Sequence, residues 1–230
     1  MNVPIGSHDL RYIVPPLIVS GIASIASKVS PYQLQTTTVY GLEGDLVALF
    51  QSITHPLLTQ FFTFVYIGLY PLLLGLTYVF LKYERGSRHI DYAFTYTAVV
   101  AAATPFFYFS PVEVTGYVID GVQPLLYEGS GIIGASVTKI DTLQKAMPSL
   151  HLALAVTASL HAPKHKLYKL LSWSITALVA VSTLYLGIHW VSDLIVGGSI
   201  AYGCYLVLPI VQSYLADILE PASADGVYGD

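Results

Sequence analysis

Long apolar runs alternate with short polar segments along the whole chain. A helix that crosses a bilayer needs about 20 mostly apolar residues, and six segments follow this pattern in whole or in part. They lie at residues 12–26, 56–81, 90–109, 149–161, 168–189 and 191–215. The pattern therefore predicts an all-α fold, a polytopic membrane bundle of about six transmembrane helices.

Three other segments do not fit a spanning helix. Residues 43–55 place apolar side chains on one side, which is typical of an amphipathic helix on a membrane surface. Residues 111–145 are interrupted by glycine and proline, so we expect a long irregular loop that serves as a lid or a substrate platform. We expect one domain at residues 1–215, followed by a polar tail at 216–230.

Composition narrows the class of protein. Hydrophobic residues make up 54% of the chain and charged residues 10%, against about 25% charged residues in a typical soluble domain. This excludes a water-soluble globule, and the hydrophobicity excludes a disordered chain. The ten Lys and Arg residues and the net charge of −4 argue against a nucleic-acid partner. Cys204 is the single cysteine, which excludes a disulfide scaffold.

Basic residues predict the orientation, because cytoplasmic loops carry an excess of Lys and Arg. With the N-terminus inside, seven of the ten basic residues are cytoplasmic. These are Arg11, Lys82, Arg85, Arg88, Lys164, Lys166 and Lys169, whereas Lys28, Lys139 and Lys145 lie outside. We therefore expect an integral protein of the cell membrane with both termini in the cytoplasm.

The start of the fourth expected span carries a first group of polar residues, Lys145, Pro148, Ser149 and His151. Proline and serine suit the first positions of a helix. The exposed N–H groups there, at the positive end of the helix dipole, form an anion site. His151 stands in the first turn and can present a proton to the same point. A capped helix with an interfacial histidine explains this segment equally well.

A second group, His189 and Asp193, stands where the fifth and sixth expected spans meet. Their spacing of four residues places them on one face of a continuous helix, within contact range. An aspartate beside a histidine fixes its tautomer and supports its charged form. A carboxylate near the bilayer centre costs about 2.5–3.5 kcal/mol, so it is usually paired and functional. A structural His–Asp pair at a helix junction is the alternative.

The expected topology brings both groups to the outer surface, because the fourth span enters there and the fifth span leaves. Two histidines beside a helix N-terminus, one of them oriented by a carboxylate, suit phosphoryl transfer. One imidazole attacks phosphorus, and the other protonates the leaving oxygen. Backbone N–H groups and lysines hold the remaining oxygens. Zinc bound by His151, His189 and Asp193 is another possibility, but the nearby lysines suit an anion better than a cation.

Two segments within residues 145–197 resemble signature motifs of the type 2 phosphatidic acid phosphatase superfamily. They read Pro148-Ser149-Leu150-His151 and Ser182-x-x-Tyr185-x-Gly187-x-His189-x-x-x-Asp193. The resemblance implies a metal-independent enzyme without a cofactor, whose substrates are lipid or polyprenyl phosphates. It implies that His189 is the nucleophile, Asp193 its orienting partner and His151 the general acid. It also implies that Ser149 and the adjacent backbone at Leu150 bind phosphate.

The chain departs from the family pattern at phosphate-binding positions. Thr183 follows Ser182 where family members usually have arginine, and the Lys–Arg string of the first motif is absent. Lys139 and Lys145 are therefore candidates for replacing part of the missing charge. Thr183 remains a candidate phosphate-binding residue.

The reaction class stays open at this point. Leu150 and Thr183 are closer to the inositol phosphorylceramide synthase-like branch, whose members pass the phosphoryl group to a lipid alcohol. Water and an alcohol attack the same phosphohistidine, so the motifs fit a lipid-phosphate phosphatase and a phosphotransferase. The missing cations also motivate an alternative from another class, a non-catalytic lipid-binding or transport protein with the same fold.

Overall fold

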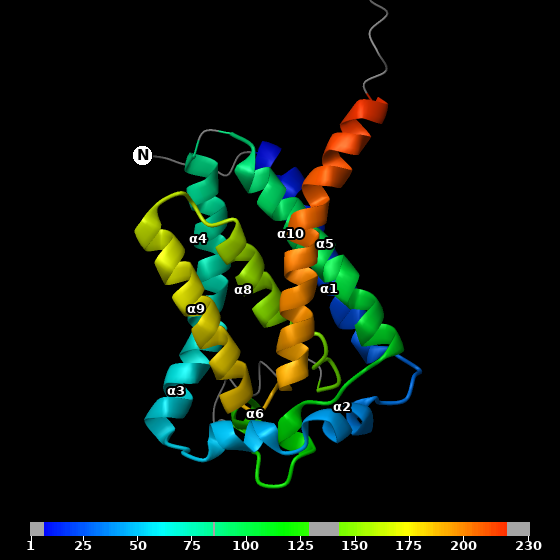
Figure 1. The fold of residues 1–230 in the computed structure, drawn as a ribbon, viewed down its shortest axis with the longest axis vertical. Coiled ribbons are helices and arrows are strands. Elements are labelled where there is room, and N and C mark those ends of the chain that lie inside the picture. Colours follow the sequence, from blue (N-terminus) through cyan, green and yellow to red (C-terminus); the bar gives the residue numbers. More distant parts are fainter. Residues whose placement is uncertain (1–6, 85, 129–142, 220–230) are drawn as a thin grey trace, which may run out of the picture.

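The computed structural model describes residues 7–84, 86–128 and 143–219, and every regular element in these ranges is helical (Figure 1). Rods that run roughly along the long axis form a bundle. They are α1 (Ser7–Lys28), the continuous run of α3 (Pro56–Phe64), η2 (Val65–Leu69) and α4 (Tyr70–Tyr83), then α5 (Arg88–Phe109), α8 (Leu150–Leu160), α9 (Lys166–Tyr185) and α10 (Val191–Leu219). The prediction of an all-α bundle is confirmed.

The short helix α8 lies at the centre of this bundle, where it contacts α4, α5, α9 and α10. Its 11 residues rise only about 16 Å, which is about half of a hydrocarbon core of about 30 Å. The first turn of α8 therefore lies inside the bundle, and α9 reaches further toward the lower end in Figure 1. Helix α1 packs on α5 at the periphery.

A layer of short helices, which we call the cap, closes the lower end of the bundle in Figure 1. It consists of α2 (Thr36–Glu43), η1 (Leu46–Gln51), η3 (Thr115–Tyr117) and α6 (Leu125–Glu128). The side-chain N–H groups of Gln51 donate to the carbonyl oxygens of Gln123 at 2.7 Å and Tyr185 at 2.8 Å. A buried apolar cluster that includes Val47 and Trp190 continues from the cap into the bundle. The cap is therefore held by packing and by hydrogen bonds to the end of α9.

The surface helix expected at residues 43–55 is wrong in its bounds. Helix α2 ends at Glu43, because Gly44 adopts a φ of 55°, a left-handed conformation that terminates helices. Residues Leu46–Gln51 then form a separate 3-10 helix. The apolar positions of this segment do not share one face, since Val47 is fully buried in the cap whereas Leu46 and Leu49 are exposed.

Four helices are long and apolar enough to cross a membrane. They are Leu10–Lys28, Pro56–Tyr83, Lys166–Tyr185 and Val191–Tyr214. The other two expected spans exist as helices but differ in kind: α5 begins with charged residues, and α8 is short. The protein therefore has the helices of an integral membrane protein, and α10 continues to Leu219, into the segment expected as a tail.

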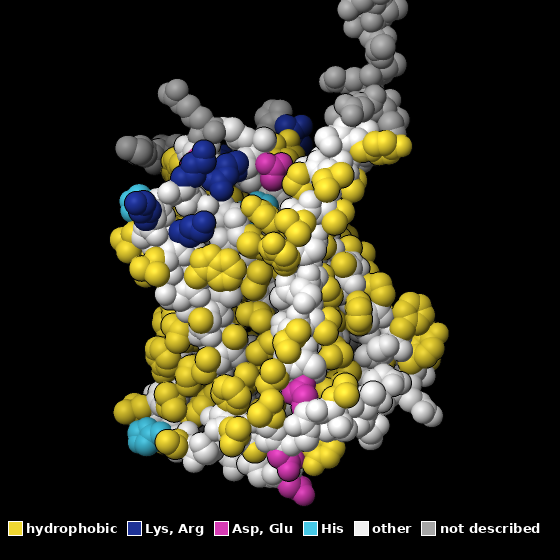
Figure 2. All heavy atoms as spheres, in the orientation of Figure 1, with side chains coloured by type: hydrophobic (Ala, Val, Ile, Leu, Met, Phe, Trp, Pro, Cys, Tyr) yellow, Lys and Arg dark blue, Asp and Glu magenta, His cyan; other side chains and the backbone are white. Residues whose placement is uncertain are grey.

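Basic side chains gather at the end of the bundle that lies opposite the cap (Figure 2). Lys82 stands in the last turn of α4, Arg88 begins α5, and Lys166 begins α9, all at this end. Acidic side chains are visible at the cap in the same view. The end of the bundle opposite the cap is thus the one rich in basic side chains. A cytoplasmic face is expected to carry such an excess.

Candidate active site

The first turn of α8 forms one half of the candidate site. Ser149 is its N-cap residue and is fully buried, and its Oγ accepts a hydrogen bond from the N–H of Leu152 at 3.4 Å. The N–H groups of Leu150 and His151 have no acceptor within the helix, as at any helix N-terminus. Gly197 of α10 allows this turn to approach closely, because a Cβ there would lie 2.4 Å from the carbonyl oxygen of Ser149.

The connection between α9 and α10 forms the other half. Helix α9 ends at Tyr185, and Gly187 turns the chain with a φ of 70°, which favours glycine. A Cβ on Gly187 would also lie 2.4 Å from the carbonyl oxygen of Gln123. His189 therefore lies in the connection, before α10 begins at Val191. The predictions of a continuous helix that carries His189 and of a span over residues 168–189 are therefore wrong.

Asp193, in the first turn of α10, fixes the orientation of His189. Its Oδ2 lies 3.1 Å from Nδ1 of His189 and accepts a hydrogen bond from the N–H of Trp190 at 2.8 Å. Asp193 is fully buried, and His189 is only 5% exposed. The second carboxylate oxygen of Asp193, Oδ1, has no hydrogen-bond partner among the residues that the structure describes. With Nδ1 held by the carboxylate, Nε2 is the nitrogen of His189 that remains for chemistry.

A carboxylate from the cap closes the N-terminus of α10. Oε2 of Glu43 accepts a hydrogen bond from the N–H of Val191 at 2.8 Å, and Oε1 accepts one from the N–H of Ser192 at 2.5 Å. Glu43 thereby satisfies N–H groups at the positive end of the helix dipole. Two helix N-termini meet at this site, and the one of α10 already holds an anionic group. The N-terminus of α8 is therefore the candidate for a phosphate.

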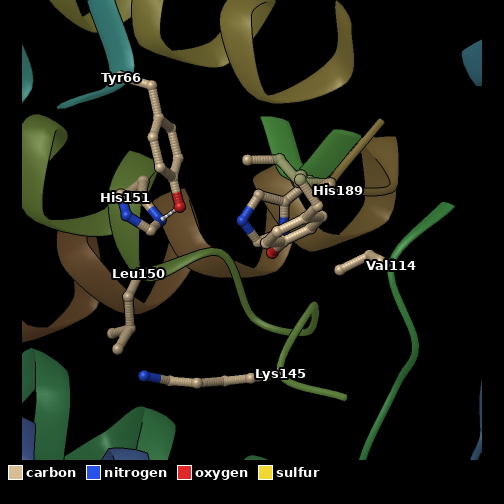
Figure 3. Close-up of a pocket in the computed structure, with 8 residues that line it drawn as sticks. Tyr66, Val114, Lys145, Leu150, His151 and His189 are labelled. Carbon is tan, nitrogen blue, oxygen red and sulfur yellow. Dashed lines mark hydrogen bonds between the residues drawn. The ribbon is translucent and has the colours of Figure 1, made fainter. Parts of the chain in front are cut away.

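The two histidines lie on facing sides of one small pocket (Figure 3), with their ring centres 6.2 Å apart. The hydroxyl of Tyr66 lies 3.4 Å from Nδ1 of His151, and it points into the gap between the two imidazoles in Figure 3. One ring nitrogen of His189 points toward the same gap. Two imidazoles that are 38 positions apart in the sequence thus share one cavity with a phenol.

A π-helical turn brings two tyrosines against His151. The N–H of Tyr70 donates to the carbonyl of Val65, five residues earlier, and Pro71 has no N–H with which to restore the regular pattern. The ring centres of Tyr66 and Tyr70 lie 4.2 Å and 5.0 Å from that of His151. Such turns inside α-helices are frequent at functional sites.

The pocket has a volume of about 20 Å³. Its lining comes from the bundle and the cap and comprises Tyr66, Val114, Tyr127, Lys145, Leu150, His151, Ile188 and His189. A cavity of this size has room for about one water molecule. A phosphoryl group therefore enters only when lining side chains move. Tyr127 of α6 forms part of the wall on the side of the cap.

Lys145 and Leu150 are the predicted phosphate-binding residues that line the pocket. The ammonium group of Lys145 lies 3.4 Å from Oγ of Ser24 and 5.0 Å from the ring centre of Phe107. In Figure 3 its side chain extends toward Leu150, at the edge of the pocket. Lys145 thus stands beside the start of α8, within reach of a group bound there after a change of rotamer.

Thr183 was predicted to bind phosphate but does not line the pocket. Thr183 is fully buried, and its hydroxyl donates to the carbonyl of Ala180 at 2.9 Å within α9. It stiffens the end of α9 and does not belong to the lining. Lys139 lies outside the described residues.

Sequence reasoning missed Tyr66, Tyr127 and Glu43. The tyrosines had no distinguishing signal, because 18 tyrosines occur in the chain and interfacial tyrosines are common in membrane proteins. Glu43 had a weak signal, since it is an acidic residue beside apolar positions. Its partners Val191 and Ser192 are about 150 positions away, so only the fold reveals its role.

The arrangement can bind an oxyanion, attack it and move a proton. The start of α8 offers N–H groups and Lys145 a positive charge, His189 offers a nucleophilic nitrogen, and His151 a proton. No group of three or more His, Cys, Asp or Glu residues in the described part of the chain is placed to hold a metal ion. The zinc alternative thus has no ready ligand set within this part.

Comparison with known proteins agrees with the motifs. No curated protein and no solved structure matches the chain. A sequence profile of the PAP2 superfamily matches residues 41–207, which is well over half of the chain and includes every residue that lines the pocket. This supports an activity of the phosphatase or phosphotransferase type on a lipid phosphate, carried out by a protein embedded in a membrane. The chain belongs to the PAP2 superfamily.

Proposed function

We propose that the protein is an integral membrane phosphatase that hydrolyses a lipid or polyprenyl phosphate through a phosphohistidine on His189. The observation that carries this proposal is the convergence of His189 and His151 in one pocket, with ring centres 6.2 Å apart. Asp193 holds the far side of the His189 ring, so the attacking nitrogen faces the pocket. We further propose that residues 1–215 form a single catalytic domain.

The proposed reaction has two steps. Nε2 of His189 attacks phosphorus, the bond from phosphorus to the lipid oxygen breaks, and His151 gives its proton to that oxygen. Asp193 stabilises the positive charge that His189 acquires. Water then attacks the phosphohistidine and gives a proton to His151, so that inorganic phosphate leaves and both histidines return to their first state.

The oxygens that do not react need positive partners in both steps. The N–H groups of Leu150 and His151 at the start of α8 supply two of them, and Ser149 fixes this turn by capping it. Lys145 supplies a charge from the edge of the pocket. We include neither a metal nor a cofactor in the reaction.

We place the pocket on the extracytoplasmic face of the cell membrane. The support is the distribution of basic residues, which gather at the end of the bundle opposite the cap (Figure 2). The first turn of α8 lies deeper in the bundle than the cap, so the phosphate reaches it from the headgroup region while the lipid chains stay among the helices. The lipid class is left to experiment.

A phosphotransferase is the second candidate, and Leu150 favours it because this residue lines the pocket. Leu150 and Thr183 are the positions at which the chain is similar to the inositol phosphorylceramide synthase-like branch. In that reaction a lipid or inositol-type alcohol replaces water in the second step. The first step and its phosphohistidine stay the same.

The test is to trap and map a phosphorylated intermediate. Purified protein is mixed with labelled short-chain phosphatidate or isoprenyl diphosphate, quenched in alkali and digested. We expect label on His189 and none in His189→Asn, with free phosphate as the product. A product that requires an added alcohol and releases no phosphate selects the phosphotransferase. Absence of label and of product with every lipid phosphate and acceptor selects a non-catalytic lipid-binding protein and overturns the proposal.

A further inference from the structure

A second cavity opens at the opposite end of the bundle, among α5, the end of α8 and α10. Its volume is about 400 Å³, against about 20 Å³ for the pocket between the two histidines. Its polar lining residues are Arg88, Asp91, Thr95, His161, Tyr205 and Gln212. The cavity is therefore large, polar at its base, and separate from the candidate active site.

Most of the polar groups around this cavity already have partners. Nδ1 of His161 lies 3.0 Å from the carbonyl oxygen of Thr157, and its Nε2 lies 3.2 Å from Oγ1 of Thr95. Arg88 binds the carboxylate of Glu84 and donates to two main-chain carbonyls at the end of α8, at 3.0 Å and 3.1 Å. These groups hold the end of α8 in place.

One acceptor at the cavity has no donor among the described residues, and a second has lost its usual helical donor. The side chain of Asp91, in the first turn of α5, forms no hydrogen bond or ion pair with the described residues. Pro209 lies inside α10 and has no N–H, so the carbonyl of Tyr205, four residues earlier, loses its helical donor. Tyr205 and Pro209 both line the cavity. The carboxylate and the carbonyl are both available to a positively charged donor that enters the cavity.

The surroundings of the cavity suit an amphiphilic ligand, which has a polar headgroup and apolar chains. The cavity lies at the end of the bundle where basic side chains gather, which is the headgroup level of one leaflet. Leu206 beside it is 48% exposed and Ile210 is 67% exposed, so the adjoining face of α10 suits lipid chains. Arg88 uses three of its N–H donors, and a guanidinium has five.

We propose that this cavity binds the headgroup of a phospholipid with a primary ammonium group. The ammonium donates to the carboxylate of Asp91 and the carbonyl of Tyr205, and the remaining donors of Arg88 hold the phosphate. The acyl chains lie along α10. A trimethylated ammonium has no N–H to donate, and an anionic headgroup without an amine places negative charge against Asp91. Both are therefore bound more weakly.

The experiment compares three lipids with identical acyl chains on the purified full-length chain. Native mass spectrometry measures the bound fraction of phosphatidylethanolamine, phosphatidylcholine and phosphatidylglycerol, and thermal unfolding measures the stabilisation by each. We expect phosphatidylethanolamine to bind most tightly and to raise the melting temperature most. Asp91→Asn keeps the shape of the side chain and should weaken binding of this lipid about tenfold, the loss expected for a hydrogen bond to a charged group.

Two further variants complete the test. Asp45→Asn, in the connection between α2 and η1 of the cap, makes the same chemical change at the other end of the bundle and should leave the binding of all three lipids unchanged. Leu208→Trp fills the cavity and should abolish the preference without touching a charge. Equal binding of the three lipids, a preference for phosphatidylglycerol, or full binding by Asp91→Asn would overturn the proposal. None of these outcomes depends on whether the protein is a phosphatase.

Discussion

The two ends of α8 each carry a histidine, and the two rings have opposite surroundings. At the C-terminal end, both nitrogens of His161 lie within 3.2 Å of a neighbouring oxygen. At the N-terminal end, His151 has the hydroxyl of Tyr66 at 3.4 Å as its one hydrogen-bond contact among the described residues, and it lines a pocket with His189. His161 is buried and His151 is half-buried, but the larger difference is in the satisfaction of their hydrogen bonds.

The backbone reinforces this difference. The C-terminal carbonyls of α8 are bound by Arg88, a cation that matches the negative end of the helix dipole. Among the described residues, no anionic side chain serves the first N–H groups of α8, whereas Glu43 serves those of α10. The hydrogen bonds at the C-terminal end of α8 are thus satisfied, whereas its N-terminal end is the site at which we propose that an anion binds. This contrast predicts how variants at the two ends will differ.

The largest effect should come from making the same substitution at a pocket histidine, His189, and at the structural histidine His161. His189→Asn removes the nucleophile and should lower kcat by about 10³-fold or more. His161→Asn should keep kcat within about threefold but lower the free energy of unfolding by about 1–3 kcal/mol, because buried partners lose hydrogen bonds. Phosphate release and thermal unfolding measure the two effects. A His161 variant that folds normally but is inactive would contradict the comparison.

The next effect tests whether His151 supplies a proton. His151→Gln should slow the hydrolysis of an alkyl phosphate by about 10²–10⁴-fold, the range for a lost general acid. The same variant should retain much more activity on a nitrophenyl phosphate, because that leaving group departs without a proton. His189→Asn is the control and should abolish both reactions alike. Equal losses on the two substrates in His151→Gln would remove the proton-donor role.

A smaller effect should come from the lysine beside the pocket. Lys145→Ala removes a positive charge next to the start of α8 and should raise KM about tenfold, the change expected for a lost charge-assisted contact. Lys28, in the last turn of α1, lies at the same end of the bundle and is exposed, so Lys28→Ala is the matched control with normal kinetics. Steady-state kinetics on a short-chain lipid phosphate measure both. A normal KM in Lys145→Ala would mean that Lys145 does not bind the phosphate, and that the main-chain N–H groups of α8 bind it without this lysine.

Glu43 acts on the reaction through the position of α10. Glu43→Gln keeps one acceptor oxygen but turns an NH₂ group toward an N–H of α10, so the turn that carries Asp193 should shift. Loss of a supporting contact of this kind typically costs about tenfold or more in activity, and we expect the low end of that range, in kcat with little change in KM. Asp45→Asn, beside it in the chain, controls for lost charge in the cap. An unchanged kcat would mean that Glu43 contributes to the stability of the fold and not to the reaction.

The catalytic half of this contrast was visible in the sequence, because it depends on local patterns. Apolar runs gave the rods of the bundle, and the spacing of His189 and Asp193 indicated their pairing. The pairing holds for a different reason than expected, since Gly187 ends α9 and Asp193 caps the start of α10. A spacing of four residues brings two side chains together in a capping turn as well as within a helix.

The rest depends on long-range packing. The hydrogen bonds of Glu43 to α10 and the contact of Tyr66 with His151 join residues 148, 149 and 85 positions apart. No local pattern encodes them. The size of the pocket is likewise a property of the packed bundle, and so are the hydrogen bonds of His161, whose position in the sequence suggested a surface residue but which is buried.

The smallest effect should come from protonating Glu84, which lies at the end of the bundle opposite the cap. Partial burial acts to raise the pKa of Glu84, but hydrogen bonds from the N–H of Lys164 and from Arg88 outweigh it and hold the pKa below its ordinary value of 4.5. A carboxyl group whose pKa is lowered on folding stabilises the fold above its unfolded pKa, and this contribution is lost as pH falls through the folded pKa. Wild type should therefore melt slightly above Glu84→Gln at pH 7, and the gap should close below pH 4.5. Thermal unfolding across this range measures it. A gap that persists in acid would mean that the side chain stabilises the α4–α5 turn by packing and not by charge.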